Sequence, residues 1–272
     1  YQNYADEYVP IEDKLRQTQI GLTEIYDRNG ERLGALPNPD AQLLDPVTLD
    51  RISKWVIEAT VSTEDNTFWD NPGINFAGLA RAAWENYAGG GIGSGTGGSS
   101  ITQQLIKNVY ICPNIATETS AACLGAAREG KAGVDRKLRE ITYALELEKD
   151  YPKEKILQWY LNQISYADRY IGIQAAAQGY FHKDAADLTL AEASLLAGVP
   201  QYHTLYHPRL NCAKPEGDPD GECVIDAQGR TVVVGEAKKR QEDVLDLMVA
   251  HNRATAEEAA APPRLYPRNR DL

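Results

Sequence analysis

The chain has 272 residues, of which 43% are hydrophobic and 25% are charged, so it is long and apolar enough to bury a globular core. Its formal net charge of -11 argues against nucleic acid as the main partner, because phosphate binding needs a basic face. No apolar run approaches the roughly 18 residues of a membrane span, and no signal-peptide pattern follows Tyr1. If the protein is exported, we expect its targeting segment upstream of this sequence.

The N-terminal part, 1–44, predicts a linker followed by a small β-hairpin. Residues 1–20 are polar and mixed, which is typical of a linker or a short helix. Residues 23–33 predict the hairpin, because Asn29-Gly30 can supply the positive φ of a tight turn.

Helical periodicity begins at residue 45, and we expect the main domain to span 45–255, followed by a linker over 256–272. Asp45 would cap a first helix that opens on Pro46 and runs to about Thr63. Glu64 and Asp65 would then end this helix, where the helix dipole disfavours carboxylates, so their position indicates a role other than helix stability. Further helices are predicted over 76–87, 102–109, 134–149, 153–164, 173–181, 190–198 and 235–252, with a second hairpin over 224–234.

Four cysteines form two local pairs in polar segments, Cys112 with Cys123 and Cys212 with Cys223, with ten residues between the members of each pair. Of the three possible connectivities, local pairing closes the shortest loops, and each crosslink would contribute roughly 2–4 kcal/mol. Two disulfides favour an oxidising, extracytoplasmic compartment, and four free thiols are the alternative. The spacing is wider than the roughly two to four residues between zinc ligands.

Candidate chemistry lies in two acidic positions that are far apart in the sequence. The pair Glu64-Asp65 is, taken alone, more often a solvated helix end than a site. The predicted helix at 134–149 adds Arg136, Lys137, Arg139 and Glu140 within little more than one turn. As a purely structural feature, an i,i+4 ion pair between Arg136 and Glu140 would stabilise the helix by only about 0.3–0.5 kcal/mol. The functional interpretation is a cationic clamp for phosphate beside a carboxylate, suited to acid/base chemistry at an anomeric carbon.

Five segments, in order, resemble the signatures of the peptidoglycan glycosyltransferases of family 51, the polymerase modules of class A penicillin-binding proteins and monofunctional transglycosylases. The segment 61–73, which begins Val-Ser-Thr-Glu-Asp-Asn-Thr-Phe, resembles the first signature, and 97–108, which begins Gly-Gly-Ser-Ser-Ile-Thr-Gln-Gln, resembles the second. The others lie at 136–140, at 155–162 with 170–181, and at 239–245. Because the five keep their order over most of the chain, the match is highly specific.

This resemblance implies a mainly α, lysozyme-like glycosyltransferase fold with a small membrane-facing jaw subdomain and short β-hairpins. It implies polymerisation of lipid II into β-1,4-linked glycan strands at the extracytoplasmic face of the bacterial cell membrane. The implied partners are lipid II, the growing glycan chain and the membrane surface. An anchor upstream of this sequence, and a transpeptidase domain or other membrane proteins outside it, are expected as well.

Roles are carried over by position. Glu64 would be the general base that takes the proton from the acceptor 4-hydroxyl, with inversion at the donor and undecaprenyl pyrophosphate as leaving group. Glu140 would lie beside that group and orient cations or a divalent metal, magnesium or manganese, although no cofactor is obligatory. Arg136 and Lys137 would stabilise the pyrophosphate charge, and Asp65 would shape the loop. The residues expected to hold or support the donor are Ser99, Thr102, Gln103, Lys107, Asn108 and Asn162.

The chain departs from the family pattern at Asn71, Ser100, Gln158 and Ala167, which stand where His, Thr, Glu and Gly are customary. The cysteine-containing loops 112–123 and 212–223 are insertions. No departure removes Glu64, Lys137 or Glu140, so activity is expected. A lysozyme-like muramidase and a non-catalytic scaffold that retains the fold are the alternatives. The aromatic residues Trp55, Trp84, Trp159 and Tyr160 are interpreted as core residues.

Overall fold

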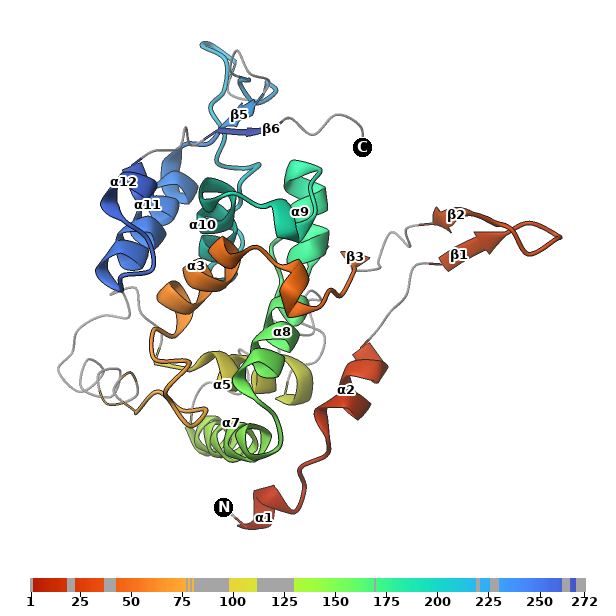
Figure 1. The fold of residues 1–272 in the computed structure, drawn as a ribbon, viewed down its shortest axis with the longest axis vertical. Helices are drawn as coiled ribbons and strands as arrows, with labels where there is room; N and C mark the ends of the chain where they lie inside the picture. The colour runs from red at the N-terminus through yellow and green to blue at the C-terminus, as the bar shows by residue number, and fades with distance from the viewer. Residues whose placement is uncertain are drawn as a thin grey trace.

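The computed structural model describes residues 2–18, 23–36, 43–76, 78, 80, 98–111, 130–168, 170–218, 221–225, 230–260 and 265–267. Helices make up most of this part of the chain and pack into one body, from which a β-hairpin projects (Figure 1). The prediction of a mainly α fold is therefore confirmed. The jaw subdomain stays a prediction, and most of the predicted helix at 76–87 lies outside the described residues.

The N-terminal segment packs against the folded body and is helical, the second of the two interpretations of residues 1–20. It contains α1 (Gln2–Ala5) and α2 (Ile11–Thr18). Ile11 is fully buried in the main core, and the Tyr8 ring stacks on Tyr110 with centroids 5.7 Å apart. Apolar burial, which the polar composition of this segment concealed, therefore holds it against the helices that follow.

The hairpin is formed by β1 (Thr23–Tyr26) and β2 (Arg32–Leu36), which pair antiparallel with Thr23 opposite Leu36. Its turn is longer than a two-residue Asn-Gly turn, and only Gly30 has a positive φ, +84°. The Asp27 carboxylate accepts the backbone N–H groups of Asn29 and Glu31, both at 2.8 Å. The hairpin prediction is confirmed, but the side chain of Asp27 shapes the turn.

The first long helix begins later than predicted. A 3-10 turn, η1 (Leu49–Arg51), precedes α3 (Lys54–Glu64), and Ser53 rather than Asp45 caps the helix by accepting from the Trp55 backbone N–H at 3.3 Å. Upstream of this turn, β3 (Leu43–Leu44) pairs in parallel with β4 (Tyr170–Ile171). Helix α3 ends at Glu64 with Asp65 as its C-cap, as predicted.

The predicted helices over 134–149, 153–164, 173–181, 190–198 and 235–252 are confirmed to within a few residues, and the one predicted over 102–109 is an α-helix followed by a π-helix. The remaining helices of the described residues are α5 (Ile101–Ile106), the π-helix η2 (Lys107–Ile111), α7 (Gly130–Asp150), α8 (Lys153–Gln163), α9 (Ile173–Phe181), η3 (Ala185–Asp187), α10 (Leu190–Gly198), η4 (Val199–Gln201), α11 (Gly235–Ala250) and α12 (Ala256–Ala260). Every residue of α10 is buried, and α3 and α11 pack against it. Helix α5 packs against both α7 and α8. The start of α5 also lies near the end of α3 (Figure 1).

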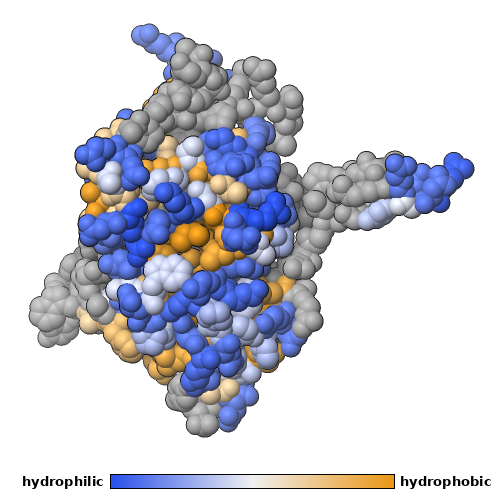
Figure 2. All heavy atoms as spheres, viewed as in Figure 1, coloured by the Kyte–Doolittle hydropathy of each residue, from blue (hydrophilic) through white to orange (hydrophobic). Residues whose placement is uncertain are grey.

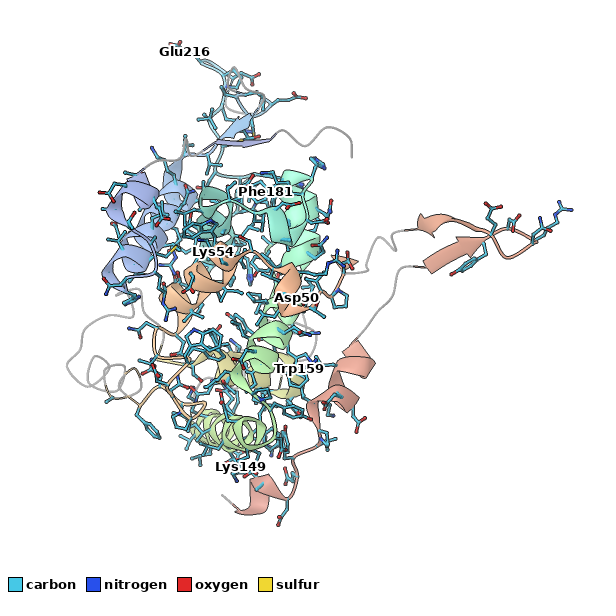
Figure 3. The ribbon with its side chains drawn as sticks, viewed as in Figure 1. Asp50, Lys54, Lys149, Trp159, Phe181 and Glu216 are labelled. Atoms are coloured by element: carbon cyan, nitrogen blue, oxygen red, sulfur yellow. A yellow bond between two sulfur atoms is a disulfide. The ribbon has the colours of Figure 1, made fainter. Side chains whose placement is uncertain are left out.

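Hydrophilic residues cover most of the face seen in Figure 2, with hydrophobic residues gathered near the middle of the body and at its lower edge. Tyr160 is fully buried, Trp159 is nearly so, and Trp55 is partly buried against the core, as predicted for these aromatic residues. Figure 3 shows Trp159 among the side chains between α8 and its neighbours. Trp84 lies outside the described residues.

A disulfide joins Cys212 and Cys223, which confirms one of the two predicted pairs. The other pair, Cys112 and Cys123, lies outside the described residues. The region predicted as a second hairpin pairs Ile225 with Thr231, and its strand β5 (Arg230–Val232) also pairs with β6 (Leu265–Pro267). The segment 256–272, predicted as a C-terminal linker, contains α12 and β6 among its described residues.

Removing the disulfide should lower stability without unfolding the protein. For the paired variant Cys212→Ser, Cys223→Ser we expect the free energy of unfolding to fall by about 2–3 kcal/mol, because the bridge closes a loop with a sequence separation of 11. Denaturant unfolding of the oxidised wild type and the double variant measures this difference. A midpoint unchanged by the substitutions would contradict the prediction.

Ala167, where glycine is customary, adopts a left-handed backbone conformation. Its φ is +67° and that of the following Asp168 is +47°. A non-glycine residue in this region costs roughly 1–2 kcal/mol. The turn is held by neighbours that bind the Asp168 carboxylate, His207 Nε2 at 2.8 Å and Arg209 Nη1 at 2.8 Å. These contacts explain how the chain tolerates alanine there.

Candidate functional site

The site is built around Glu64, at the C-terminal end of α3. Its Oε2 atom accepts a hydrogen bond from Gln104 Nε2 on α5 at 2.8 Å. The five residues before Glu64 are all buried, so α3 brings the carboxylate out of the core only in its last turn. Glu64 itself is partly exposed, and a ligand can therefore reach it.

Burial raises the pKa of the Glu64 carboxyl, because a low-dielectric environment disfavours the charged form. The hydrogen bond from Gln104 and the charges of Arg240 and Lys107 oppose this rise, whereas the charge of Asp65 adds to it. A carboxylate with a raised pKa is a better proton acceptor near neutral pH. This environment suits Glu64 to general-base catalysis.

A second group of charged side chains lies on α7. Glu140 is only 3% exposed, and its two oxygens accept from different cations: Arg136 Nη1 at 2.7 Å and Lys137 Nζ at 3.3 Å. Lys137 Nζ also donates to Ser99 Oγ at 2.9 Å. The structure thus brings together four of the predicted site residues, with Ser99 preceding α5 and the others on α7.

Lys107, the first residue of η2, interacts electrostatically with both Glu64 and Glu140. Burial lowers the pKa of its ammonium, and the charges of Glu140 and Glu64 oppose that effect. The charges of Arg136 and Lys137 lower it further. None of the ion pairs among the described residues involves Lys107, so its ammonium can serve an anionic ligand between Glu64 and the α7 cations. Asn108 follows it on η2 and is partly buried.

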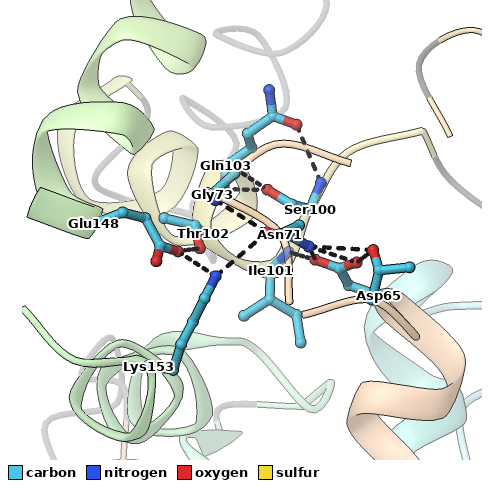
Figure 4. Close-up of polar contacts among 10 residues, drawn as sticks. Asp65, Asn71, Gly73, Ser100, Ile101, Thr102, Gln103, Glu148 and Lys153 are labelled. Carbon is cyan, nitrogen blue, oxygen red and sulfur yellow. Dashed lines mark hydrogen bonds and ion pairs between the residues drawn. The ribbon is translucent and has the colours of Figure 1, made fainter. Parts of the chain in front are cut away.

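Asp65 has the loop-shaping role that was expected of it. It is 2% exposed and accepts from the backbone N–H of Ile101 at 3.2 Å, which ties α3 to the first turn of α5 (Figure 4). Asn71 Nδ2 donates to its Oδ2 at 2.9 Å, Thr67 Oγ1 to its Oδ1 at 3.0 Å and Asn75 Nδ2 to its Oδ1 at 3.3 Å. One buried carboxylate thereby satisfies donors from three segments around Glu64.

Asn71, which stands where histidine is customary, joins this network to a second one. Its Oδ1 accepts from the Gly73 backbone at 3.0 Å and from Lys153 Nζ at 3.3 Å. Lys153 also binds Glu148 at 2.7 Å, and Glu148 accepts from Thr102 Oγ1 at 2.6 Å (Figure 4). Asn71 therefore serves a structural function at this position.

Three predicted donor-binding residues make internal contacts, and their role in donor binding stays a prediction. Thr102 is fully buried against Glu148, and Gln103 is fully buried as the N3 residue of a capping box with Ser100. Asn162 is 4% exposed and clamps Val47, accepting from its N–H at 2.9 Å and donating to its carbonyl at 2.8 Å. These side chains shape the site by holding the backbone.

Sequence reasoning missed Gln104, the residue that contacts Glu64. The capping box of Ser100 and Gln103 assigns Gln103 to the helix N-terminus, but no sequence pattern shows that Gln104 faces α3. Arg240, within the fifth segment, was missed as well. It is 5% exposed, and its charge acts on Glu64 from α11.

The Asp65 network should be a main source of local stability. Asp65→Ala leaves several buried donors without an acceptor, and we expect a loss of roughly 2–4 kcal/mol in the free energy of unfolding. Asp70→Ala is the matched control, since Asp70 lies on the same turn but is exposed. Urea unfolding should show a clear shift for the first variant and less than about 0.5 kcal/mol for the second. Equal midpoints would contradict the role of Asp65.

Comparison with known proteins was made over the whole chain. The family model described as transglycosylase matches residues 29–227. Penicillin-binding protein 1F of Bacillus subtilis (strain 168) is 32% identical over 242 residues, covering 84% of this chain and 30% of the relative. Penicillin-binding protein 1A of Aquifex aeolicus (strain VF5) is 38% identical over 190 residues, covering 68% and 23%.

Two further similarities concern proteins named penicillin-binding protein 1A. That of Mycobacterium tuberculosis is 33% identical over 209 residues, covering 77% of this chain and 23% of the relative. The crystal structure of the Haemophilus influenzae protein aligns with a TM-score of 0.40 at 17% identity, covering 92% of this chain and 22% of that one. The chain spans less than a third of the length of these relatives.

Proposed function

Because this chain belongs to the transglycosylase family of peptidoglycan glycosyltransferases, we propose that it polymerises lipid II into β-1,4-linked glycan strands in bacterial cell-wall synthesis. The observation that carries the proposal is the arrangement around Lys107. The charges of both Glu64 and Glu140 act on this cation, and Glu140 in turn binds Arg136 and Lys137. A proton acceptor and an anion-binding group are thus joined in one site.

In the proposed reaction, Glu64 removes the proton from the 4-hydroxyl of the acceptor sugar. The resulting oxygen attacks C1 of the donor, and the bond between C1 and the pyrophosphate oxygen breaks with inversion. The proton stays on Glu64, and the electron pair leaves with undecaprenyl pyrophosphate. The raised pKa of Glu64 supports this role, since it favours proton uptake near neutral pH.

Stabilisation of the leaving group is assigned to Lys107, Arg136 and Lys137. Positive charges placed where negative charge develops lower the barrier most when they are fixed in advance. Glu140 fixes Arg136 and Lys137, since each of its oxygens binds one of these two cations. Glu140 therefore holds the α7 cations in place without a metal ion. A magnesium or manganese ion beside Glu140 stays a prediction.

A muramidase-like hydrolase is the second candidate, because paired acids and a lysozyme-like fold suit it as well. Its leaving group would be a neutral sugar hydroxyl, which needs no cluster of cations. The three cations of the described site therefore favour the transferase. A non-catalytic scaffold would have no use for a carboxylate with a raised pKa, and Glu64 argues against it.

We propose further that the protein works at the extracytoplasmic face of the membrane, where lipid II and the growing glycan are its partners. The Cys212–Cys223 disulfide supports an oxidising compartment. Val134 and Leu138, 62% and 49% exposed, are apolar residues one turn apart on α7, in the same part of the helix as the cations. Their exposure supports contact with a lipid surface. No helix in the described ranges is long and apolar enough to cross a membrane.

The test is incubation of the purified chain with lipid II in detergent, followed by gel separation of the products. Glycan polymer is the expected product. Purified sacculi provide the second arm, in which soluble muropeptides would identify a hydrolase. Muropeptides without polymer would overturn the proposal in favour of the muramidase, and the absence of both products would favour the scaffold.

A further inference from the structure

A chain of two hydrogen bonds leads from a buried tyrosine to Glu64. The Tyr160 hydroxyl on α8 donates to Gln104 Oε1 at 3.2 Å, and Gln104 Nε2 donates to Glu64 Oε2 at 2.8 Å. Three helices thus contribute one residue each. Tyr160 is fully buried, so its hydroxyl lies where an unmet hydrogen bond is costly.

The tyrosine hydroxyl stays neutral, because burial raises the pKa of Tyr160 well above its usual range and the charge of Glu64 adds to that effect. A neutral hydroxyl can donate or accept, and an amide has one end of each kind. When Glu64 is ionised, the donating end of Gln104 must face it, and the carbonyl end then requires a donor. Tyr160 supplies that donor.

From this geometry, and on the basis of the function proposed above, we propose that Tyr160 is a positioning residue for the general base. By fixing the Gln104 amide, it keeps Glu64 Oε2 bonded and leaves Oε1 to take the acceptor proton. Once Oε1 carries the proton, Oε2 is the carbonyl oxygen of the acid and still accepts from Gln104 Nε2. The hydrogen bonds from Tyr160 through Gln104 to Glu64 can therefore be kept in both protonation states.

Other charged and titratable groups also face Glu64, and their effects are present whether or not Tyr160 is. Lys107 on η2 and Arg240 on α11 lower the pKa of Glu64, and the adjacent Asp65 raises it. Tyr166 is equally buried and also senses the charge of Glu64. Its hydroxyl has no hydrogen-bond partner in the described part of the chain, so it provides a matched comparison.

The test compares Tyr160→Phe with Tyr166→Phe in lipid II polymerisation, using thermal unfolding to establish that both variants fold. For Tyr160→Phe we expect kcat to fall about tenfold, the effect of one hydrogen bond, with KM changed less than about twofold. The acid limb of the kcat–pH profile should move to higher pH, because a less firmly held amide lowers the pKa of Glu64 less. For Tyr166→Phe the acid limb should stay in place.

A double-variant cycle separates positioning through Gln104 from general packing. Gln104→Leu, at a partly exposed position, should move the acid limb in the same direction, and adding Tyr160→Phe should move it no further. Additive shifts, or an unshifted limb in both single variants, would overturn the inference. If Tyr160→Phe does not fold, an unshifted limb in Gln104→Leu alone overturns it.

Failure of this inference is distinct from failure of the proposed function. A wild-type chain that makes no polymer would remove the function itself. A wild-type chain that polymerises lipid II, together with a Tyr160→Phe variant of normal kcat and normal acid limb, would remove only the role of Tyr160.

Discussion

Glu64→Gln is expected to abolish detectable glycan polymerisation, with a rate loss of about 10²–10⁴. Glutamine keeps the shape of the side chain but cannot accept a proton from the sugar hydroxyl. The hydrogen bond from Gln104 would also face an amide in place of a carboxylate. Polymer yield from lipid II at several times of incubation gives the rate, and thermal unfolding should show that the fold is retained.

Glu58→Gln is the control for this experiment. Glu58 lies on the same helix α3 but pairs with Arg253 at 2.5 Å, away from Gln104 and the α7 cations. Its substitution should leave the polymerisation rate within about twofold of wild type. Polymer at a near-wild-type rate from Glu64→Gln would remove Glu64 as the general base.

The second large effect concerns the leaving-group side of the site. Lys137→Met retains the length of the side chain but removes its charge, and we expect kcat to fall by about 10²–10³, the usual cost of losing one group that stabilises transition-state charge. The Ser99 hydroxyl and one oxygen of Glu140 lose a partner at the same time. Both kcat and kcat/KM should fall, because charge on the pyrophosphate grows in the transition state.

Lys149→Met on the same helix provides the matched comparison. Lys149 is 58% exposed in its side chain and pairs with Glu146 on the surface, so activity should be unchanged. A loss for Lys137→Met that appears only as a higher KM would show that this lysine binds substrate and transition state equally. That outcome would contradict a role in stabilising the departing pyrophosphate.

Helices with their own periodicity and caps could be predicted from sequence, and those placed by distant contacts could not. Helix α9 has the predicted bounds, and α10 also carries a Thr189–Glu192 capping box that is visible in the sequence. The start of α3 was placed eight residues too early, since Asp45 and Pro46 resemble a helix start. The buried amide of Asn162 holds Val47 in a non-helical position, and no local pattern reveals such a contact.

The same distinction applies within the site. Glu140 and Lys137 lie on one helix, so their proximity follows from spacing alone. Tyr160 looked like a core residue and is one by burial, yet its hydroxyl is directed at Gln104. Which of two adjacent glutamines faces Glu64 depends on how α5 docks between α7 and α8, and only the three-dimensional arrangement decides it.

The π-helical turn η2 has a consequence for insertions and deletions. Its hydrogen-bonded rings span one residue more than those of an α-helix, so it behaves like a helix that carries an extra residue. Lys107 at its start senses Glu64 and Glu140, while Tyr110 near its end stacks on Tyr8 and donates to the Val9 carbonyl at 2.6 Å. Deleting one residue between Lys107 and Tyr110 would rotate them relative to each other by about 100°. The length of this turn should therefore vary less among functional sequences than its composition does.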